Sequence, residues 1–261
     1  MLEIREILTK LMKKEISIQE AEKLVKLTAI EEITELAKID IHRHLRKGVP
    51  EIILAEGKTP EEVREIAIKI LERTGRVIIT RLDEQQTKLL QKSVSDDVEV
   101  KLNKKARILV IKKRGLEIKG GGKIGILTAG TADIPVAEEA RVVAEEMGCE
   151  VTVAYDVGVA GLHRLISPLK DFIQKDIDVL IVVAGREGAL PSVVASLVDI
   201  PVIGVPTSIG YGFGEKGLSA LMAMLQACSL GLAVVNIDGG VAAGALAALI
   251  ANKVASKTNR E

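Results

Sequence analysis

The feature that most constrains the fold is a series of short, wholly apolar segments after residue 123, which alternate with segments of helical periodicity. Strands in a sheet covered on both faces are apolar throughout, whereas half-exposed strands alternate apolar and polar side chains. The pattern therefore predicts an α/β fold with an open parallel sheet and flanking helices. The predicted strands are residues 124–128, 151–155, 179–184, 202–205 and 234–237, and the predicted helices are 136–147, 161–174, 191–197, 216–230 and 241–254.

The first 118 residues are richer in charged side chains and predict a smaller α+β domain. Thr59 and Glu62 form a capping-box pattern with a proline between them, so a helix is expected to begin there and to end at Gly75. Other helical or strand patterns occur at residues 4–11, 21–27, 52–54, 77–80 and 107–111. We place the boundary before three consecutive glycines, with an N-terminal α+β domain at 1–118 and an α/β domain at 119–261.

Composition argues against several classes of function. The formal net charge is zero, with 36 basic and 36 acidic residues, so neither nucleic acid nor a membrane surface is an expected partner. Cys149 and Cys228 lie far apart, and the three histidines add no zinc-ligand spacing. The N-terminus lacks a signal-peptide pattern, and the longest apolar run, residues 239–250, is too short to span a bilayer. We expect a cytoplasmic protein with free thiols.

The loops that follow the predicted strands are the candidate site, because open parallel sheets bind ligands beyond the carboxyl ends of their strands. Gly130, Thr131 and Asp133 lead from the first of these strands into a helix, whose free backbone N–H groups suit a phosphate. A purely structural turn has the same features, and both interpretations are open. The turn matches neither a dinucleotide fingerprint nor a Walker loop, which argues against conventional redox and nucleoside-triphosphatase enzymes.

Charged residues stand at two further strand ends. Arg186 and Glu187 follow the middle strand between two glycines, either as ligand-binding groups or as a solvated charge pair. Asp238 and Gly239 follow the last strand, where the carboxylate suits a ribose hydroxyl or a magnesium-bound water, or alternatively caps the last helix.

The segment from residue 206 to residue 217 combines four glycines with Tyr211 and Phe213, two of only four aromatic residues in the chain. This composition predicts a lid that stacks on a flat ring, and the alternative is a mobile loop with one ring packed on the core. Cys228 continues the apolar spacing of Leu218, Leu221 and Leu225 in the helix predicted next, so the pattern alone favours a small buried side chain. Cys149 is interpreted as structural.

Residues 120–250 resemble the aminoimidazole ribonucleotide carboxylases and mutases. The similarity is carried by the residues from Gly130 to Asp133, by the segment 188–191 and by the segment 201–206. It implies a flavodoxin-like parallel sheet that binds a nucleotide. Ala189 stands where those enzymes carry a proton-shuttling histidine, which argues against a purine-pathway carboxylase or mutase. That activity is kept as an alternative.

The whole chain resembles the LarB family, the pyridinium-3,5-biscarboxylic acid mononucleotide synthases of nickel-pincer nucleotide biosynthesis. The matching segments are residues 40–43, 46–51, 56–59, 124–133, 155–161, 186–191 and 228–240. The resemblance implies that nicotinic acid adenine dinucleotide is carboxylated with CO2 and that its phosphoanhydride is hydrolysed to release AMP. We also expect a homo-oligomer, because the small residues of 239–251 allow close helix packing between subunits. Mg2+ is an expected cofactor with no assigned ligands, and neither biotin nor flavin is expected.

This chemistry explains the need for a cysteine at Cys228. A cationic pyridinium ring does not attack CO2, but thiolate addition beside the ring nitrogen creates a neutral, enamine-like carbon that does. Loss of a proton and expulsion of the sulfur then restore the aromatic ring. With the resemblance added, Cys228 is the predicted nucleophile. Glu187 is predicted either to accept the released proton or to help activate the thiol, and we expect both residues to share a cavity with the Gly130 turn.

The resemblance also gives the remaining candidates their expected roles. Phe213 or Tyr211 covers the pyridinium face. The residues expected to bind the nucleotide are Gly130, Thr131, Asp133, Asp156, Arg186, Phe213, Asp238 and Gly239. Asp156 and Asp238 are also the candidates for phosphoanhydride hydrolysis. A non-catalytic nucleotide sensor that uses the same loops is a further alternative, because a fold by itself does not determine function.

Overall fold

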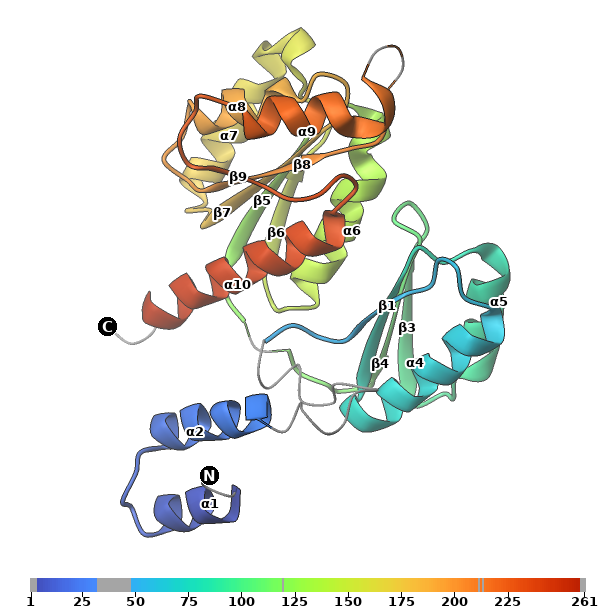
Figure 1. Cartoon of the computed structure of the whole chain (residues 1–261), viewed down its shortest axis with the longest axis vertical. Helices are drawn as coiled ribbons and strands as arrows, with labels where there is room; N and C mark the ends of the chain where they lie inside the picture. The colour runs from blue at the N-terminus through green and yellow to red at the C-terminus, as the bar shows by residue number, and fades with distance from the viewer. Residues whose placement is uncertain (1–3, 32–47, 119, 211, 213, 259–261) are drawn as a thin grey trace.

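The computed structural model describes residues 4–31, 48–118, 120–210, 212 and 214–258. Figure 1 shows two β-sheets, each with its own helices, and a separate pair of N-terminal helices. The pair consists of α1 (Ile4–Met12) and α2 (Ile18–Glu31), where the helical periodicity predicted them. Among the side chains of this pair that the structure describes, Ile7 and Ala21 are buried and apolar.

The first sheet has the strand order β1-β2-β4-β3, with β1 parallel to β2 and the other pairs antiparallel. Its elements are β1 (Ile52–Leu54), α4 (Pro60–Thr74), β2 (Arg76–Thr80), α5 (Glu84–Ser93), β3 (Val98–Asn103) and β4 (Ile108–Lys113). The capping box of Thr59 and Glu62 is present, and Gly75 ends α4 with a φ of 74°. The predicted start and end of this helix are confirmed.

One helix beside the first sheet, α5, and one strand within it, β3, were not predicted from the sequence. Helix α5 is mostly polar and buries only Gln86 and Leu90, so it lacks a wide apolar stripe. Strand β3 carries charged side chains and is buried only at Val98. Elements that bury so few side chains are stabilised by packing against their neighbours, and their own sequences carry only a weak apolar pattern.

The second sheet is entirely parallel and has the strand order β6-β5-β7-β8-β9. Its elements are β5 (Lys123–Thr128), η2 (Thr131–Asp133), α6 (Ile134–Glu145), β6 (Glu150–Ala154), η3 (Val159–Gly161), α7 (His163–Gln174), β7 (Val179–Ala184), α8 (Ala189–Ala195), β8 (Val202–Pro206), η4 (Glu215–Gly217), α9 (Leu218–Leu225), β9 (Leu232–Val234) and α10 (Gly240–Thr258). This is the flavodoxin-like order, in which the strand order reverses between β5 and β7 while all strands stay parallel. The predicted α/β fold class is confirmed.

Helices cover both faces of the second sheet, as the wholly apolar strands predicted. Helices α6 and α10 pack on one face, while α7, α8 and α9 pack on the other. Every residue of β7 and β8 is buried. The predicted boundary at residue 118 falls in the segment between the two sheets and stays a prediction.

Two predictions near the end of the chain are wrong. Strand β9 ends at Val234, where the predicted strand was expected to begin. Helix α9 ends at Leu225, so Cys228 lies in the segment that follows it and is exposed. The helix faces the core with Ala220, which lies against Gly188, and with Met224, which lies against Gly204, and it leaves Leu225 65% exposed. The predicted buried stripe through Cys228 does not form.

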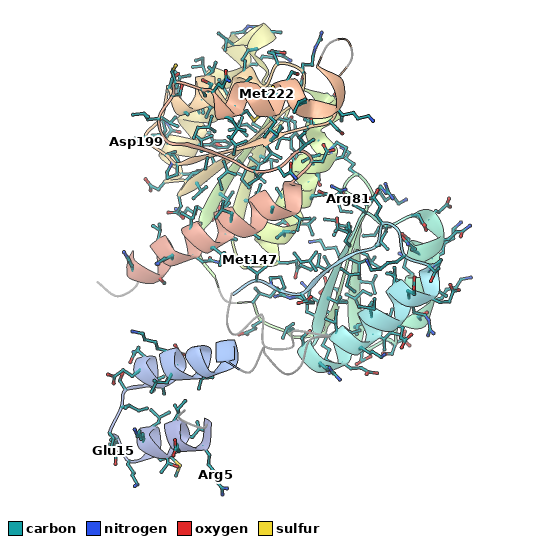
Figure 2. The ribbon with its side chains drawn as sticks, viewed as in Figure 1. Arg5, Glu15, Arg81, Met147, Asp199 and Met222 are labelled. Carbon is teal, nitrogen blue, oxygen red and sulfur yellow. The ribbon has the colours of Figure 1, made fainter. Side chains whose placement is uncertain are left out.

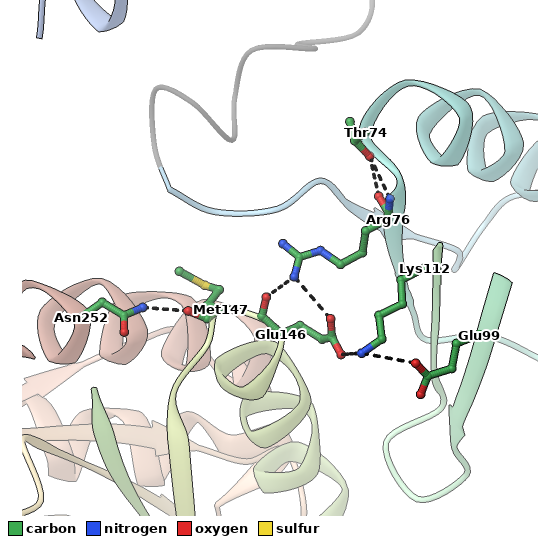
Figure 3. A network of polar contacts seen from close by, with 7 residues as sticks. All are labelled: Thr74, Arg76, Glu99, Lys112, Glu146, Met147 and Asn252. Carbon is green, nitrogen blue, oxygen red and sulfur yellow. Dashed lines mark hydrogen bonds and ion pairs between the residues drawn. The ribbon is translucent and has the colours of Figure 1, made fainter. Parts of the chain in front are cut away.

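The two sheets are joined through α6. The face of the first sheet away from α4 and α5 contributes Ile78, Ile108 and Val110 to a buried cluster with Val142 of α6. Beside this cluster, the Arg76 guanidinium donates to the carbonyl of Glu146 and lies 3.3 Å from its carboxylate (Figure 3). Lys112 lies 3.6 Å from the same carboxylate. The contact is therefore an apolar patch flanked by a buried ion pair.

Candidate functional site

The Gly130 turn lies at the switch point of the second sheet, between the carboxyl ends of β5 and β7. The Asp133 carboxylate accepts the Gly130 N–H at 2.9 Å and the Thr207 hydroxyl at 2.7 Å. Burial raises the pKa of Asp133 above its ordinary value, although these hydrogen bonds lower it. Asp133 thus ties the β5 turn to the end of β8 and faces inward, whereas Thr131 is exposed.

The start of α6 carries few free backbone N–H groups. The N–H groups of Asp133 and Ile134 donate to the carbonyls of Gly130 and Thr131, and Pro135 has no N–H. The N-cap side chain makes no hydrogen bond to the helix. Asp133 thus has the structural role of the second interpretation, and phosphate binding at Gly130 and Thr131 stays a prediction.

The loop after β7 is closely packed at its glycines and exposed at its charges. A Cβ on Gly185 would lie 2.6 Å from the Thr207 hydroxyl oxygen, so no side chain fits there. Gly188 has a φ of 65°, and a Cβ on it would lie 2.7 Å from the carbonyl oxygen of Ala220. Between them, the side chains of Arg186 and Glu187 are exposed. The glycines hold the backbone against its neighbours and present both charges outward at the same edge of the sheet.

Asp238 links the last strand to the loop after β8. Its carboxylate accepts the Ser208 N–H at 2.8 Å, and its own N–H donates to the carbonyl of Pro206 at 2.9 Å. The carbonyl of Gly239 accepts the Ala243 N–H in the first turn of α10. The alternative that Asp238 serves only as the cap of the last helix is therefore wrong.

Asp156 follows β6, at the edge of the sheet next to β5. Its N–H donates to the Thr128 hydroxyl at 3.0 Å, which fixes its backbone to β5. Its carboxylate forms an exposed ion pair with Arg164 at 2.7 Å. The structure thus brings Gly130, Asp133, Asp156, Arg186, Glu187, Asp238 and Gly239 to one edge of the second sheet.

Glu139 is a buried carboxyl that the sequence analysis missed. It lies on α6, and its carboxylate accepts the Thr80 hydroxyl at 3.1 Å. The Nε of Arg81 lies 3.9 Å from the same carboxylate (Figure 2). Burial raises the pKa of Glu139 to about 7. Its spacing from Val136 and Val143 places it on the core-facing side of the helix, and this was the signal available.

Cys228 lies in the segment that follows α9. Helix α9 begins near Thr207 at the carboxyl edge of the sheet and runs for eight residues, about 12 Å. Ser229, next to Cys228, donates to the carbonyl of Ser192 at 2.8 Å, and Ser192 belongs to α8, the helix that starts just after Glu187. No hydrogen bond or ion pair between described residues joins Cys228 to Glu187 or to the Gly130 turn. The shared cavity of these residues stays a prediction.

The two cysteines differ in their surroundings. Cys149 is buried, and burial raises the pKa of its thiol to about 11. Its Sγ lies 3.5 Å from the Asn252 side-chain oxygen. Cys228 is an exposed free thiol. Of the two cysteines, Cys228 is thus the accessible one.

Some predicted features fall outside the described residues. They include Phe213 and Tyr211 of the predicted lid, and residues 40–47 of the first matching segments. Within the described part of the chain, no group of three or more His, Cys, Asp or Glu side chains is arranged to hold a metal ion. Among the same residues, no helix is both long enough and apolar enough to cross a membrane.

Comparison with known families identifies both halves of the chain. Residues 30–114 match the family described as the LarB/PurE-like N-terminal domain, and residues 123–261 match the AIR carboxylase family. The chain belongs to the AIR carboxylase family and has the LarB architecture. The LarB family indicates an enzyme of the carboxylase or mutase type, with a nucleotide substrate and CO2.

Individual relatives cover this architecture to different extents. An uncharacterised protein of Methanocaldococcus jannaschii is 49% identical over 250 residues, which cover 95% of this chain and 96% of the relative. N5-carboxyaminoimidazole ribonucleotide mutases of Pyrococcus abyssi and Thermotoga maritima are 35% and 32% identical. Each covers only 49% of this chain, so these mutases share one half of the LarB architecture.

Proposed function

We propose that the protein carboxylates the pyridinium ring of nicotinic acid adenine dinucleotide with CO2 and hydrolyses its phosphoanhydride. The products are pyridinium-3,5-biscarboxylic acid mononucleotide and AMP, in nickel-pincer nucleotide biosynthesis. The observation that carries the proposal is the LarB-type N-terminal domain in front of an AIR carboxylase domain that has Ala189 in place of a proton-carrying histidine. The exposed thiol of Cys228 supports it.

In the proposed reaction the Cys228 thiolate adds to the ring carbon beside the nitrogen, and the electron pair of the C=N bond moves to the nitrogen. The neutral ring then attacks CO2 through the neighbouring carbon and forms a C–C bond. Glu187 takes the proton from that carbon, the C–S bond breaks, and the thiolate leaves with its electron pair. One water molecule cleaves the phosphoanhydride, with Asp156 and Asp238 as the proposed groups near it.

A contact between two copies of the chain is proposed near Cys228, which lies in the segment after α9. The surface around Cys228 suits such a contact, because Leu225 and Leu230 are 65% and 92% exposed beside it. This is the physical reason to propose a homo-oligomer.

Nucleotide binding is proposed for the loops at the carboxyl edge. The exposed residues of the Gly130 turn are proposed to hold phosphate, together with the exposed side chain of Arg186. The described side chains do not form a cage for Mg2+, and no step of the proposed reaction depends on the ion. Magnesium commonly binds through substrate phosphates, so its requirement is tested directly below.

The deciding experiment incubates the protein with nicotinic acid adenine dinucleotide and bicarbonate, with and without Mg2+, and follows the products by mass spectrometry. We expect AMP and a dicarboxylated mononucleotide. Cys228→Ala is expected to lower the rate of carboxylation by at least about 1000-fold, because no other group forms the ring adduct. Cys149→Ala, which removes the buried cysteine, is the matched control. An undiminished rate in Cys228→Ala contradicts the mechanism.

A purine-pathway mutase is the second candidate, because residues of the second half are 35% identical to the N5-carboxyaminoimidazole ribonucleotide mutase of Pyrococcus abyssi. Ala189 opposes this activity, since no imidazole is present there to carry the proton. Assaying the protein with N5-carboxyaminoimidazole ribonucleotide decides between the candidates. Tight nucleotide binding without turnover of either substrate supports the sensor instead.

A further inference from the structure

Two arginines at opposite ends of one strand connect the first sheet to the second domain. Arg76 begins β2 and contacts Glu146 just after α6. Arg81 follows the last residue of β2 and contacts the loop that carries Asp238. The first contact is remote from the carboxyl-edge loops, whereas the second reaches one of them. The two arginines therefore have different consequences for the candidate site.

The guanidinium of Arg81 is engaged by protein groups on three sides. Its Nη2 donates to the carbonyl oxygen of Asp238 at 3.2 Å, and its Nη1 lies 3.2 Å from a carboxylate oxygen of Glu56. Its Nε faces Glu139 at 3.9 Å. With all three nitrogens directed at protein acceptors, the group is suited to hold a loop rather than to bind substrate itself.

The backbone at this contact is also held in an unusual conformation. Arg81 has a φ of 55° and Asp238 has a φ of 55°, both in the left-handed region that non-glycine residues rarely occupy. Arg107 Nη2 donates to the Arg81 carbonyl at 3.1 Å and supports this conformation. Strained residues persist where surrounding contacts over-determine them, and they often occur at functional sites.

Asp238 transmits this contact to a second loop. Its carboxylate accepts the Ser208 N–H, and its own N–H donates to Pro206, so its orientation sets the start of the segment after β8. Gly240 lies against α6 beneath it, where an added Cβ would be 2.8 Å from the Cβ of Glu139. The loop is therefore held by α6 on one side and by Arg81 on the other.

We propose that Arg81 is a positioning residue through which the N-terminal domain orients the Asp238 loop for nucleotide binding. This inference rests on the nucleotide site of the proposed function, but not on the carboxylation chemistry. It gives the N-terminal domain a direct role: the nucleotide site is complete only when Arg81 reaches the Asp238 carbonyl.

The first test measures hydrogen–deuterium exchange in the full-length protein without nucleotide. Arg81→Met keeps most of the side-chain volume but removes the donors, and we expect amide exchange in residues 235–240 to increase about tenfold. Arg81→Lys, which keeps a charged donor, is expected to restore part of the protection. Arg76→Lys is the matched control at the other end of β2 and is expected to leave residues 235–240 unchanged. Unchanged exchange in Arg81→Met overturns the proposal, as does an equal effect of Arg76→Lys.

The second test measures the dissociation constant for nicotinic acid adenine dinucleotide and for AMP by calorimetry. Arg81→Met is expected to weaken binding about tenfold, and Arg81→Lys is expected to weaken it less, because it keeps a donor for the Asp238 carbonyl. Unchanged binding in Arg81→Met overturns the positioning role. If the wild-type protein yields no carboxylated product, the proposed function is contradicted. The role of Arg81 is still decided separately, by the difference in hydrogen–deuterium exchange between the wild type and Arg81→Met.

Discussion

At the scale of single residues, the most informative side chain is Glu139. Its position on the core-facing side of α6 follows from helical spacing, but its partners do not. Thr80 and Arg81 come from the other sheet, and Asp238 comes from the far end of the chain. Burial raises the pKa of Glu139 to about 7, because the nearby arginine only partly compensates for the lost hydration.

Replacement of Glu139 by Gln is expected to stabilise the protein at pH 8 and to have little effect at pH 5. The pKa of Glu139 lies above its ordinary 4.5 in the folded state, so its contribution to stability is lost as pH rises from 4.5 through about 7. The isosteric amide removes that loss, which corresponds to about 3 kcal/mol at most. Urea unfolding at both pH values measures it. A variant that is less stable than wild type at pH 8 contradicts this account.

At the scale of elements, α9 shows how packing overrides an apolar pattern. The sequence offered Leu218, Leu221 and Leu225 as a stripe, but the core accepts Ala220 and Met224. The reason is the close approach of the loop after β7, where Gly188 touches the backbone of Ala220. A helix packed this closely presents small or flexible side chains to its neighbours.

Gly188→Ala is expected to destabilise the protein by about 3 kcal/mol or more, since it combines a positive φ with a backbone clash. Gly115→Ala is the matched control, because Gly115 has a φ of 76° and nothing within 4 Å of an added Cβ. It is expected to cost only about 1 kcal/mol. Chemical denaturation of both variants measures the difference. Equal losses mean that the contact with Ala220 is unimportant.

At the scale of the whole molecule, the two sheets are held together by an apolar cluster and a buried ion pair. Burial lowers the pKa of Arg76, while the charge of Glu146 opposes this shift. Removing one partner of such a pair leaves an uncompensated charge in a poorly hydrated place. The junction therefore depends on Arg76 more than on any exposed ion pair.

Arg76→Met is expected to lower the free energy of unfolding by about 3–5 kcal/mol, because it leaves Glu146 with only Lys112 at 3.6 Å. Lys69→Met, which breaks the exposed pair with Glu65, is the control and is expected to change stability by less than about 1 kcal/mol. Calorimetry is the measurement. If both variants unfold at the same temperature, the buried pair does not hold the domains together.

Apolar periodicity and helix capping predicted the parallel sheet, its flanking helices and the start of α4, because both are local properties of the chain. The strand ends also carried seven candidate residues that the structure gathers at one edge. The packed fold was needed to show which side of α9 is buried, that Cys228 lies outside this helix, and that Arg81 reaches Asp238. These depend on contacts between residues far apart in the chain, and no local pattern specifies their partners.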